Sequence, residues 1–414
     1  MKCHNYLLCL IIITFQDNGI AASFMAKDPR SLAMGGTNVA VSSYGNQVLY
    51  NPALLSSANE KKAVYWGIPS FSIRVADPDN LSLAIDDFTE NKYFDNFNSA
   101  LSDFNQSATF AELDRSRIQV VKTGNELVDN LSSLSNKAIE LQGSLAVFFA
   151  DTDRGLPLAF SVNAWGSFGI VGVVIDNDLQ QMRETLDAVD NLNIIGIQIP
   201  NPTTDFESNI QGRGILLQEF ALSLSFSNSL SNISFSYGVT PKYVHVNTYD
   251  YHFTAVEIDF AEISLRSGLK TSQNFNMDAG LAIDFSERWR WGMAIKNLFT
   301  QKYDTILNNS IELKPTARTG FSYHFTNQVI SIDYDLTQEE GLGIGGSSQY
   351  LSAGYEFQGN VTSLRFGYRH NFPDNNVNVA SLGISFKVWS TRMDFSVAAS
   401  ENEISSAAQL IYIH

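Results

Sequence analysis

The 414-residue sequence predicts an all-β fold, a transmembrane antiparallel β-barrel of about 14 strands with helical insertions. Three observations lead to this expectation. The N-terminus has the composition of an export signal, no later stretch reaches the roughly 18 apolar residues of a membrane-spanning helix, and alternating apolar and polar residues fill the C-terminal half. An exported chain of this kind is either a soluble periplasmic β-protein or a barrel that meets the membrane through many short strands.

Residues 1–22 have the features of a signal peptide. Lys2 supplies the positive start, an apolar run of about ten residues spans 6–15, and small residues at the end of the segment suit a signal peptidase. Both cysteines, Cys3 and Cys9, lie in this segment. We therefore expect a mature chain without thiols, which excludes disulfides, thiolate zinc sites and cysteine nucleophiles.

Composition and motifs exclude several functional classes. The formal net charge is -16, so nucleic acid is not an expected partner, because phosphate backbones need clustered Lys and Arg. The six histidines include no pair at a helical metal spacing, and the acidic turn 151–155 lacks most calcium ligands. His324 beside Ser322 fits a hydrolytic pair no better than a lumen position, and the glycines at 341–346 lack a βαβ context. We expect neither an enzyme nor a bound cofactor or metal.

From residue 216 onward, large apolar side chains alternate with small or polar ones in short segments. In residues 277–285, for example, Met, Ala, Leu, Ile and Phe alternate with Asp, Gly, Ala and Asp. Successive side chains of a strand point to opposite faces, so each segment has one apolar and one polar face. In a sandwich the apolar face would form a core, whereas in a membrane barrel it meets lipid. Earlier strand candidates are 63–75, 143–150, 157–165 and 168–174.

Two further features favour the membrane barrel over the sandwich. The polar face is crowded with Gly and Ser, which suits a packed lumen. Aromatic residues gather toward the strand ends, as expected of interfacial girdles. They are Trp289, Trp291, Phe299, Tyr323, Phe325, Tyr355, Phe357 and Trp389.

The polar faces also carry charges of both signs. We expect these side chains to face the lumen and to pair across strands, which would hold a plugged interior together. The predicted lumen charges are Asp278, Asp284, Arg290, Lys296, Arg318, Asp333, Asp335, Glu356, Arg365, Arg369, Lys387 and Asp394. A continuous water channel is only one outcome of such a set.

Two stretches lack the alternating pattern of strands and are predicted as helical insertions, at about 81–141 and 176–213. In the first, apolar residues recur at steps of three and four among Asp, Glu, Asn and Lys. In the second, a shorter helix spans 178–191 with a cap at Asp176 or Asn177, and a polar loop follows. Helices cannot form the lipid-facing wall of a barrel, so they either plug the lumen or sit on one rim.

The most distinctive run reads DPRSLAMGGTNVAV, and LYNPALL follows it. Gly35 and Gly36 permit backbone angles or close packing that a side chain would forbid. Asn51 is pushed toward an extended conformation by Pro52, which can open a short helix as its first residue. This pattern predicts a compact, hydrogen-bonded N-terminal knot, and an ordinary turn before the first strand is the simpler alternative.

This region resembles the N-terminal signature of the conjugal transfer TraF-like outer-membrane proteins, which are similar to the FadL-type barrels that carry fatty acids and hydrocarbons. Further matching stretches are NMDAGLAIDFSERWRWGMAIKNL, PTARTGFSYHF, ISIDYDL and YLSAGYEFQGNVTSLRFGYRHNF. The resemblance implies a barrel of about fourteen strands over residues 61–414, with the N-terminal segment 23–60 acting as a hatch. The hatch would include Gly35, Gly36, Asn51, Pro52 and Ala53.

The sequence departs from these proteins at two points. The conjugation protein that lent the TraF name is elsewhere described as a soluble thioredoxin-like factor, but no Cys-x-x-Cys survives in this mature chain, so that chemistry is excluded. The last residue is His414, where many outer-membrane barrels end in Phe. Leu410 and Tyr412 nevertheless occupy the expected alternate positions.

Three functions remain open. The resemblance implies an outer-membrane protein that passes a hydrophobic small molecule through a hatch-plugged lumen. The alternative is a non-transporting outer-membrane scaffold of a conjugal transfer or secretion apparatus, whose helices dock a periplasmic protein. A soluble periplasmic β-protein is the third. In the first two, outer-membrane lipid is itself a partner of the protein.

Overall fold

The computed structural model describes residues 19–20, 24–57, 62–153, 155–191, 199–200, 205–230, 233–254, 268–340, 347–373 and 378–414. The predicted signal peptide falls outside these ranges except for β1 (Gly19–Ile20), and so does the glycine-rich segment 341–346. Within the described residues, no helix combines the length and the apolar character that a membrane crossing requires.

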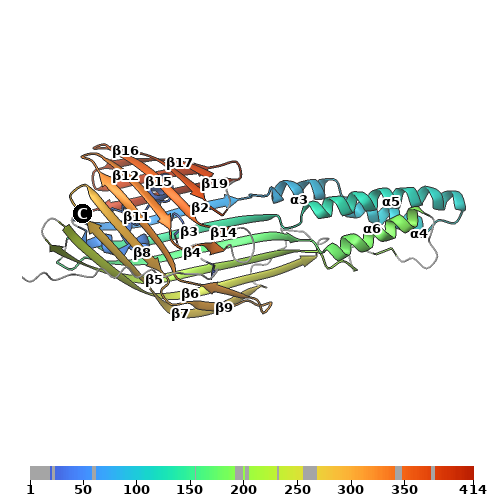
Figure 1. Ribbon diagram of the computed structural model, residues 1–414, viewed down its shortest axis with the longest axis horizontal. Helices are drawn as coiled ribbons and strands as arrows, with labels where there is room; N and C mark the ends of the chain where they lie inside the picture. Colours follow the sequence, from blue (N-terminus) through green and yellow to red (C-terminus); the bar gives the residue numbers. More distant parts are fainter. Residues whose placement is uncertain are drawn as a thin grey trace, which may run out of the picture.

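Fourteen antiparallel strands close into a barrel (Figure 1). The strands follow one another round the wall in chain order, and β19 pairs with β2 to complete the ring. They are β2 (Val64–Ala76), β3 (Ala138–Asp151), β4 (Leu158–Val173), β5 (Asn209–Leu230), β6 (Ile233–Thr254), β7 (Leu269–Asp284), β8 (Trp289–Lys296), β11 (Thr316–His324), β12 (Gln328–Asp335), β15 (Tyr350–Gln358), β16 (Thr362–Asn371), β17 (Asn378–Val388), β18 (Thr391–Ala399) and β19 (Glu403–Ile413). The predicted all-β barrel is confirmed.

The alternation in the sequence gives this wall two faces. Along β16, Leu364, Phe366 and Tyr368 are exposed on the outside, while Arg365 and Arg369 are buried inside. Each strand of the ring has a hydrogen-bonded neighbour on both sides, so the described wall presents no open edge. The outer face of this strand is therefore apolar, and its inner face carries charges.

The two ends of the barrel differ. At one end short turns join the strands, such as residues 285–288 between β7 and β8, and the C-terminus lies there (Figure 1). At the other end most of the connections are longer, and their described residues form four helices and several short strands. We refer to these as the short-turn end and the long-loop end.

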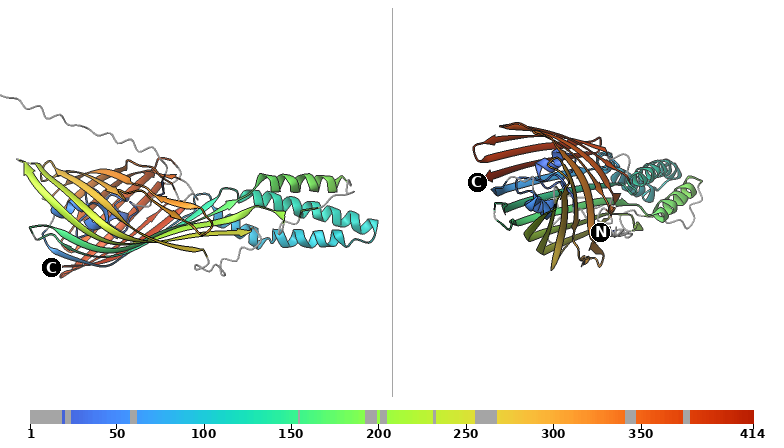
Figure 2. Two further views of the ribbon diagram at one scale, coloured as in Figure 1. Left: turned by 90° about the horizontal axis from the view of Figure 1, so that it is seen from below. Right: turned by 60° about the vertical axis from the view of Figure 1, so that its left-hand side comes forward.

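A helical arm projects from the long-loop end, continuing the long axis of the molecule (Figure 1, Figure 2). It consists of α3 (Leu81–Glu90), α4 (Tyr93–Asn105), α5 (Phe110–Ser133) and α6 (Asp176–Asp190). The arm has a hydrophobic core of its own, in which Phe97, Leu127, Met182 and Leu186 are fully buried. The predicted helices thus sit on one rim, and the alternative that they plug the lumen is wrong.

The predicted element boundaries are less accurate than the elements themselves. The insertions expected at 81–141 and 176–213 are too wide, because β3 begins at Ala138 and β5 at Asn209. Mixed polar and apolar residues at these points fit a helical period as well as an alternating one. The two strands predicted between residues 157 and 174 form one strand, β4, because the Gly-Ser pair between them continues the pairing with β3.

The start of α6 also differs from the prediction. Its N-cap is Ile175, so neither Asp176 nor Asn177 caps the helix. Asp178 has a different role, because its carboxylate accepts hydrogen bonds from the backbone N–H and the hydroxyl of Ser208, at 2.7 and 2.6 Å. These bonds tie the first turn of α6 to the start of β5.

A second, smaller sheet lies at the long-loop end. Its order is β14 (Ser347–Ser348), β13 (Glu339–Glu340), β1, β10 (Ser310–Leu313) and β9 (Gln301–Asp304). Ile311 and Leu313 of β10 share a buried cluster with Trp165 and Val246, which point inward from the wall. The small sheet therefore covers part of the inner face of the wall at this end.

Residues 24–57 lie inside the barrel and are hereafter the plug (Figure 2). The plug contains α1 (Pro29–Ala33), α2 (Gln47–Tyr50) and the 3-10 helix η1 (Pro52–Ser56). Nearly all of its side chains are buried, polar ones such as Asn38 and Asn51 included. The N-terminal segment therefore fills the lumen as a compact unit.

The separate core of the arm leads to a prediction about its stability. Leu186 is buried beside Gly124, whereas Leu83 is exposed on the same arm. We expect Leu186→Asp to unfold the arm, because burying an unpaired carboxylate is costly, and Leu83→Asp to leave it folded. Limited proteolysis should cleave only the first variant within the arm, while both keep the heat-modifiable gel migration of an intact barrel. Equal protease resistance of the two variants would contradict a separate core.

Candidate functional site

The plug begins with a capped helix whose sequence explains its shape. Asp28 is the N-cap of α1, and its carboxylate accepts hydrogen bonds from the backbone of Arg30 and Ser31 at 2.9 and 3.2 Å. Pro29 occupies the first helical position, where no backbone donor is needed. Asn46 donates to the same Asp28 oxygen at 3.1 Å. This contact fixes the first half of the plug to the second.

Gly35 and Gly36 form the turn after α1. Their φ angles are 71° and 98°, in the left-handed region that side chains rarely adopt. Gly35 also lies directly against the wall, because a Cβ at this position would come within 2.6 Å of the Tyr368 carbonyl oxygen. Its backbone N–H donates to the Ser381 hydroxyl at 3.1 Å. Both backbone angle and close packing therefore require glycine here.

The Asn-Pro-Ala element, residues 51–53, holds the other half of the plug. The Asn51 carboxamide accepts from the backbone N–H of Ala53 at 3.1 Å, which starts η1. It also donates to the Leu281 carbonyl of β7 at 3.1 Å. A side chain at Gly280 would overlap Asn51, so the wall is shaped to receive it. The Asn-Pro-Ala element is thus held against β7 by hydrogen bonds and by close packing.

One ion-pair network joins the plug to the strands β15, β16 and β18. Arg30 of α1 binds Glu356 of β15, with Nη2 2.7 Å from Oε2. Glu356 also binds Arg365 at 2.7 Å, and Arg365 binds Asp394 at 3.0 Å. Arg392 lies 3.0 Å from the second oxygen of Asp394. All five side chains are buried, so each charge depends on its partners for stabilisation.

A second network crosses β5, β6, β7 and β8. Lys242 lies between Glu219 and Asp278, at 2.7 and 2.9 Å. Lys296 binds Asp278 at 3.0 Å and donates to a plug carbonyl at 2.9 Å. Lys27 of the plug lies 3.7 Å from Glu219, and burial lowers the pKa of its ammonium group to about 8. The plug is therefore held by charges on two separate sectors of the wall.

Backbone groups of the plug are also held by charged side chains. Asp333 of β12 accepts from the backbone N–H groups of Asn38 and Val39 at 2.7 and 3.0 Å. Arg318 of β11 donates to the Gly36 carbonyl at 3.0 Å. These contacts satisfy polar groups of the Gly-Gly turn that burial would otherwise leave without a partner.

Of the twelve predicted lumen charges, all but one are buried inside the barrel. The pairs not yet described are Asp284 with Arg290, Arg318 with Asp335, and Arg369 with Glu403. The remaining one, Lys387, is exposed. It has the inward parity, opposite the buried Arg392, and lies near the end of β17, where water reaches it.

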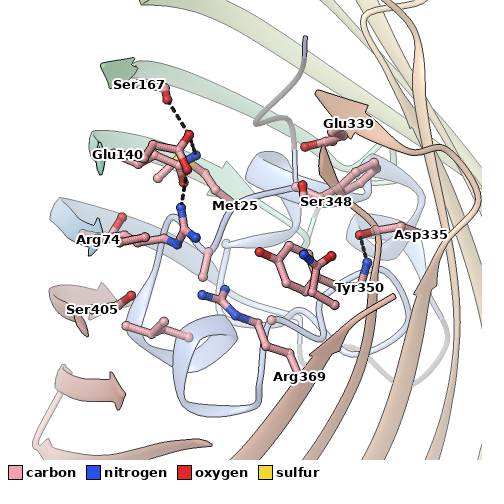
Figure 3. Close-up of a pocket in the computed structure, with 18 of the residues that line it drawn as sticks. Met25, Arg74, Glu140, Ser167, Asp335, Glu339, Ser348, Tyr350, Arg369 and Ser405 are labelled. Atoms are coloured by element: carbon pink, nitrogen blue, oxygen red, sulfur yellow. Dashed lines mark hydrogen bonds and ion pairs between the residues drawn. The ribbon is translucent and has the colours of Figure 1, made fainter. Parts of the chain in front are cut away.

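A cavity of about 120 Å³ lies on the long-loop side of the plug. Its floor is the start of the plug, with Phe24, Met25 and Leu32, and Trp165 and Ile215 add apolar surface from the wall. The remaining lining is mostly polar and comes from inward-facing residues of β2, β3, β15 and β16, several of which are shown in Figure 3.

Ion pairs and an aromatic ring shape the polar side of this cavity. Arg74 of β2 binds Glu140 of β3 at 2.8 Å and Glu403 of β19 at 2.9 Å. Arg369 of β16 also binds Glu403, and its guanidinium carbon lies 5.1 Å from the centroid of the Tyr350 ring. Figure 3 shows Arg369 beside Tyr350, with Arg74 joined to Glu140 on the neighbouring wall.

Several of these residues are absent from the sequence prediction. They are Lys27, Arg30, Arg74, Glu140, Glu219, Lys242, Tyr350, Arg392 and Glu403. Glu219 and Lys242 share the inward parity of Ser223 and Thr240, whose hydroxyls meet inside the lumen, so the alternation alone could have identified them. Lys27 and Arg30 lie in the plug, where no sequence period indicates a partner.

The hydrolytic pair considered from the sequence has a structural role. The Ser322 hydroxyl and His324 Nε2 are 3.0 Å apart, but the hydroxyl also donates to the Ala40 carbonyl of the plug at 3.0 Å. Ser322 is therefore one more contact between wall and plug. In the part of the chain that the structure describes, no group of His, Cys, Asp and Glu is arranged to hold a metal ion.

Solved structures with a partly similar fold include transport proteins. The Pseudomonas putida toluene transporter TodX is 12% identical, with a TM-score of 0.44, covering 93% of this chain and 96% of that one. The Ralstonia pickettii toluene transporter TbuX is 11% identical, with a TM-score of 0.46, covering 93% and 97%. The CymD monoaromatic hydrocarbon channel is 12% identical, with a TM-score of 0.47, covering 94% and 97%. No curated protein matches the sequence significantly.

A family described as "F plasmid transfer operon, TraF, protein" matches residues 48–335. The match includes the Asn-Pro-Ala element and the wall strands from β2 to β12. Because it covers well over half of the chain, the protein belongs to this TraF family.

Proposed function

We propose that the protein is an outer-membrane barrel that passes a small molecule through its lumen, with the plug acting as the hatch. The observation that carries the proposal is the way the plug fills the lumen. Residues 24–57 contact the wall through several small apolar clusters, such as Leu32 with Val379 and Met34 with Val329, and through many hydrogen bonds and ion pairs. Water can replace the polar contacts when the plug moves, and the buried ion pairs add little net stability, so these contacts do not lock the plug in place.

The outer face of the wall supports a membrane location. On β7 the outward side chains are apolar from Phe275 to Phe285, a span of about ten residues that suits a tilted membrane-crossing strand. The Phe275 ring packs with Tyr243 at one level, with 5.3 Å between centroids. Trp289 and Tyr323 pack at the other, with 4.6 Å between centroids. Aromatic residues at two levels are typical of membrane interfaces.

The difference between the barrel ends supports one orientation. Outer-membrane barrels have short periplasmic turns and longer extracellular loops, which would put the arm outside the cell. Beyond Phe275, β6 and β7 continue toward the arm with polar outward residues such as His245 and Gln273, as expected above a membrane surface. The 24 residues of α5 add a further reach of about 36 Å.

The proposal also concerns the chemical class of the ligand. A hydrophobic molecule is what the resemblance to FadL-type barrels implies. The cavity floor of Phe24, Met25 and Leu32 would suit such a ligand, but the charged walls would not. A molecule with one apolar and one polar face therefore fits this cavity better than a hydrocarbon does.

Movement of the plug need not disturb the wall. When Arg30 leaves Glu356, that carboxylate keeps Arg365 at 2.7 Å and Arg392 at 3.9 Å. When Lys27 leaves Glu219, Lys242 remains. The wall therefore neutralises its own charges with the plug displaced, so a ligand that contacts the plug floor could shift it inward at moderate cost.

The arm supports a second candidate, the non-transporting scaffold. It has its own core, and residues 77–137 and 176–190 contain 16 acidic and 6 basic residues, a strongly polar surface for a partner. Under the proposed orientation the partner would approach from outside the cell, and not from the periplasm as the sequence suggested. A soluble periplasmic protein is disfavoured, because its whole outer wall would expose apolar side chains to water.

Removing the buried cation of the plug should loosen the hatch. Arg30→Gln deletes the plug side of the pair with Glu356, while Arg365 and Arg392 still neutralise that carboxylate. We expect severalfold higher conductance in planar lipid bilayers, with unchanged heat-modifiable migration of the barrel. Lys270→Gln, which removes a partly exposed cation on β7, is the matched control and should conduct like the parent protein. Equal conductance of the Arg30 variant and the parent would argue against a hatch.

A disulfide between plug and wall should reverse this effect. The hydroxyl oxygens of Ser56 and Ser225 are 2.6 Å apart, so cysteines at both positions would bring their sulfurs within bonding reach. In the Arg30→Gln background, oxidation of the Ser56→Cys, Ser225→Cys pair should lower the conductance to the parent value, and a reductant should restore it. Each single cysteine variant is a control. Persistent high conductance after complete oxidation would show that the pathway does not pass the plug.

Surface labelling tests the location and the orientation together. Ser99 in α4 and Ser229 near the end of β5 are both exposed. Ser99→Cys should react with a bulky polyethylene-glycol maleimide in intact cells, and Ser229→Cys only after the outer membrane is permeabilised. The reverse pattern would overturn the orientation. Recovery of the protein in the soluble fraction would overturn the membrane location.

A further inference from the structure

The cavity on the long-loop side of the plug carries an inference that rests on the proposed function and names its substrate class. At roughly 10–15 Å³ per enclosed water, a cavity of about 120 Å³ holds about ten water molecules. This space corresponds to a molecule of about a dozen non-hydrogen atoms. A compact ring compound fits within this space, whereas a long acyl chain would extend beyond it.

Five of the charged side chains that line the cavity form ion pairs with one another or with Glu403, and Glu339 and Glu340 of β13 add two carboxylates to the lining. Arg74 binds Glu140 and Glu403, and Arg369 binds Glu403 as well. On the opposite side Arg318 is paired with Asp335. An anionic ligand would lose its hydration here and would have to break an existing pair to find a countercharge. The electrostatics therefore favour an uncharged ligand over an anionic one.

Polar groups at the cavity nevertheless keep hydrogen-bonding capacity. Arg369 is nine-tenths buried, and its Nε has no hydrogen-bond partner among the described residues. The Tyr350 hydroxyl and the side chains of Ser348 and Ser352 line the same space. A hydrocarbon would leave these groups buried and unsatisfied, whereas a ligand with several hydroxyl groups could bond to them.

The floor of the cavity, in contrast, is apolar. Phe24 and Met25 of the plug form it, with Trp165 and Ile215 beside them. A ring compound with hydroxyl groups at its edge and C–H groups on its face can satisfy both sides at once. We propose that this cavity binds a small uncharged polyhydroxylated solute of the size of a single sugar ring.

Equilibrium binding to the purified, detergent-solubilised protein tests this inference. Saturation-transfer NMR would compare methyl α-glucoside as the neutral polyol, decanoate as an anionic amphiphile and toluene as a hydrocarbon. We expect saturable binding of methyl α-glucoside. Saturable binding of decanoate or toluene without the glucoside, or of none of the three, would overturn the inference.

A matched pair of variants tests the position of the site. Tyr350→Phe removes a hydroxyl from the cavity and should weaken glucoside binding about threefold to tenfold. Tyr368→Phe removes a hydroxyl from the outer face of the neighbouring strand and should change nothing. Arg369→Lys, which keeps the charge for Glu403 but removes Nε, should weaken binding as Tyr350→Phe does. Identical affinities of all three variants would place the site elsewhere.

The failure of this inference can be distinguished from failure of the transport proposal. If the protein binds methyl α-glucoside but Arg30→Gln leaves its conductance unchanged, the result supports the binding site and contradicts the hatch. If the conductance responds to Arg30→Gln and to the disulfide but the protein binds only toluene or decanoate, the result supports the hatch and contradicts this substrate class.

Discussion

The pairing of β19 with β2 is the constraint on which the rest of the structure depends. Once the ring is closed, each side chain of the wall must face either outward or inward, and alternation assigns it. The seam tolerates one irregularity, because Ile68 and Pro69 of β2 are passed over in the pairing on both sides. Proline lacks the donor that a regular ladder needs, so this is where a skipped pair is least costly.

Closure also explains why the interior is so highly charged. A plug held in the lumen by apolar packing alone would be hard to separate from the wall, since apolar surfaces brought together resist rewetting. Buried pairs such as Arg30 with Glu356 give little net stability, but they specify one seating of the plug and exclude others. Asp333, which accepts two backbone N–H groups of the plug, has the same effect without a cation.

The sequence predicts the wall better than it predicts the site. Alternation is a local signal, so Asp278, Arg290 and Arg365 could each be assigned to the lumen from their own segments. It does not predict burial at strand ends, where Lys387 has the inward parity but is exposed to water. The ion-pair partners of these side chains are harder to predict, because Arg30 and Glu356 are 326 residues apart and no local pattern links them. The cavity combines the plug with strands from both halves of the chain, so only the closed ring reveals it.

The plug directly precedes β2, the strand that forms one side of the closing seam, and β19 is the last strand of the chain. The segment that fills the lumen is therefore covalently joined to one strand of the closing seam. When its polar contacts are broken, this connection keeps the plug tethered to the barrel, so displacement does not release it and it can return to the same seat.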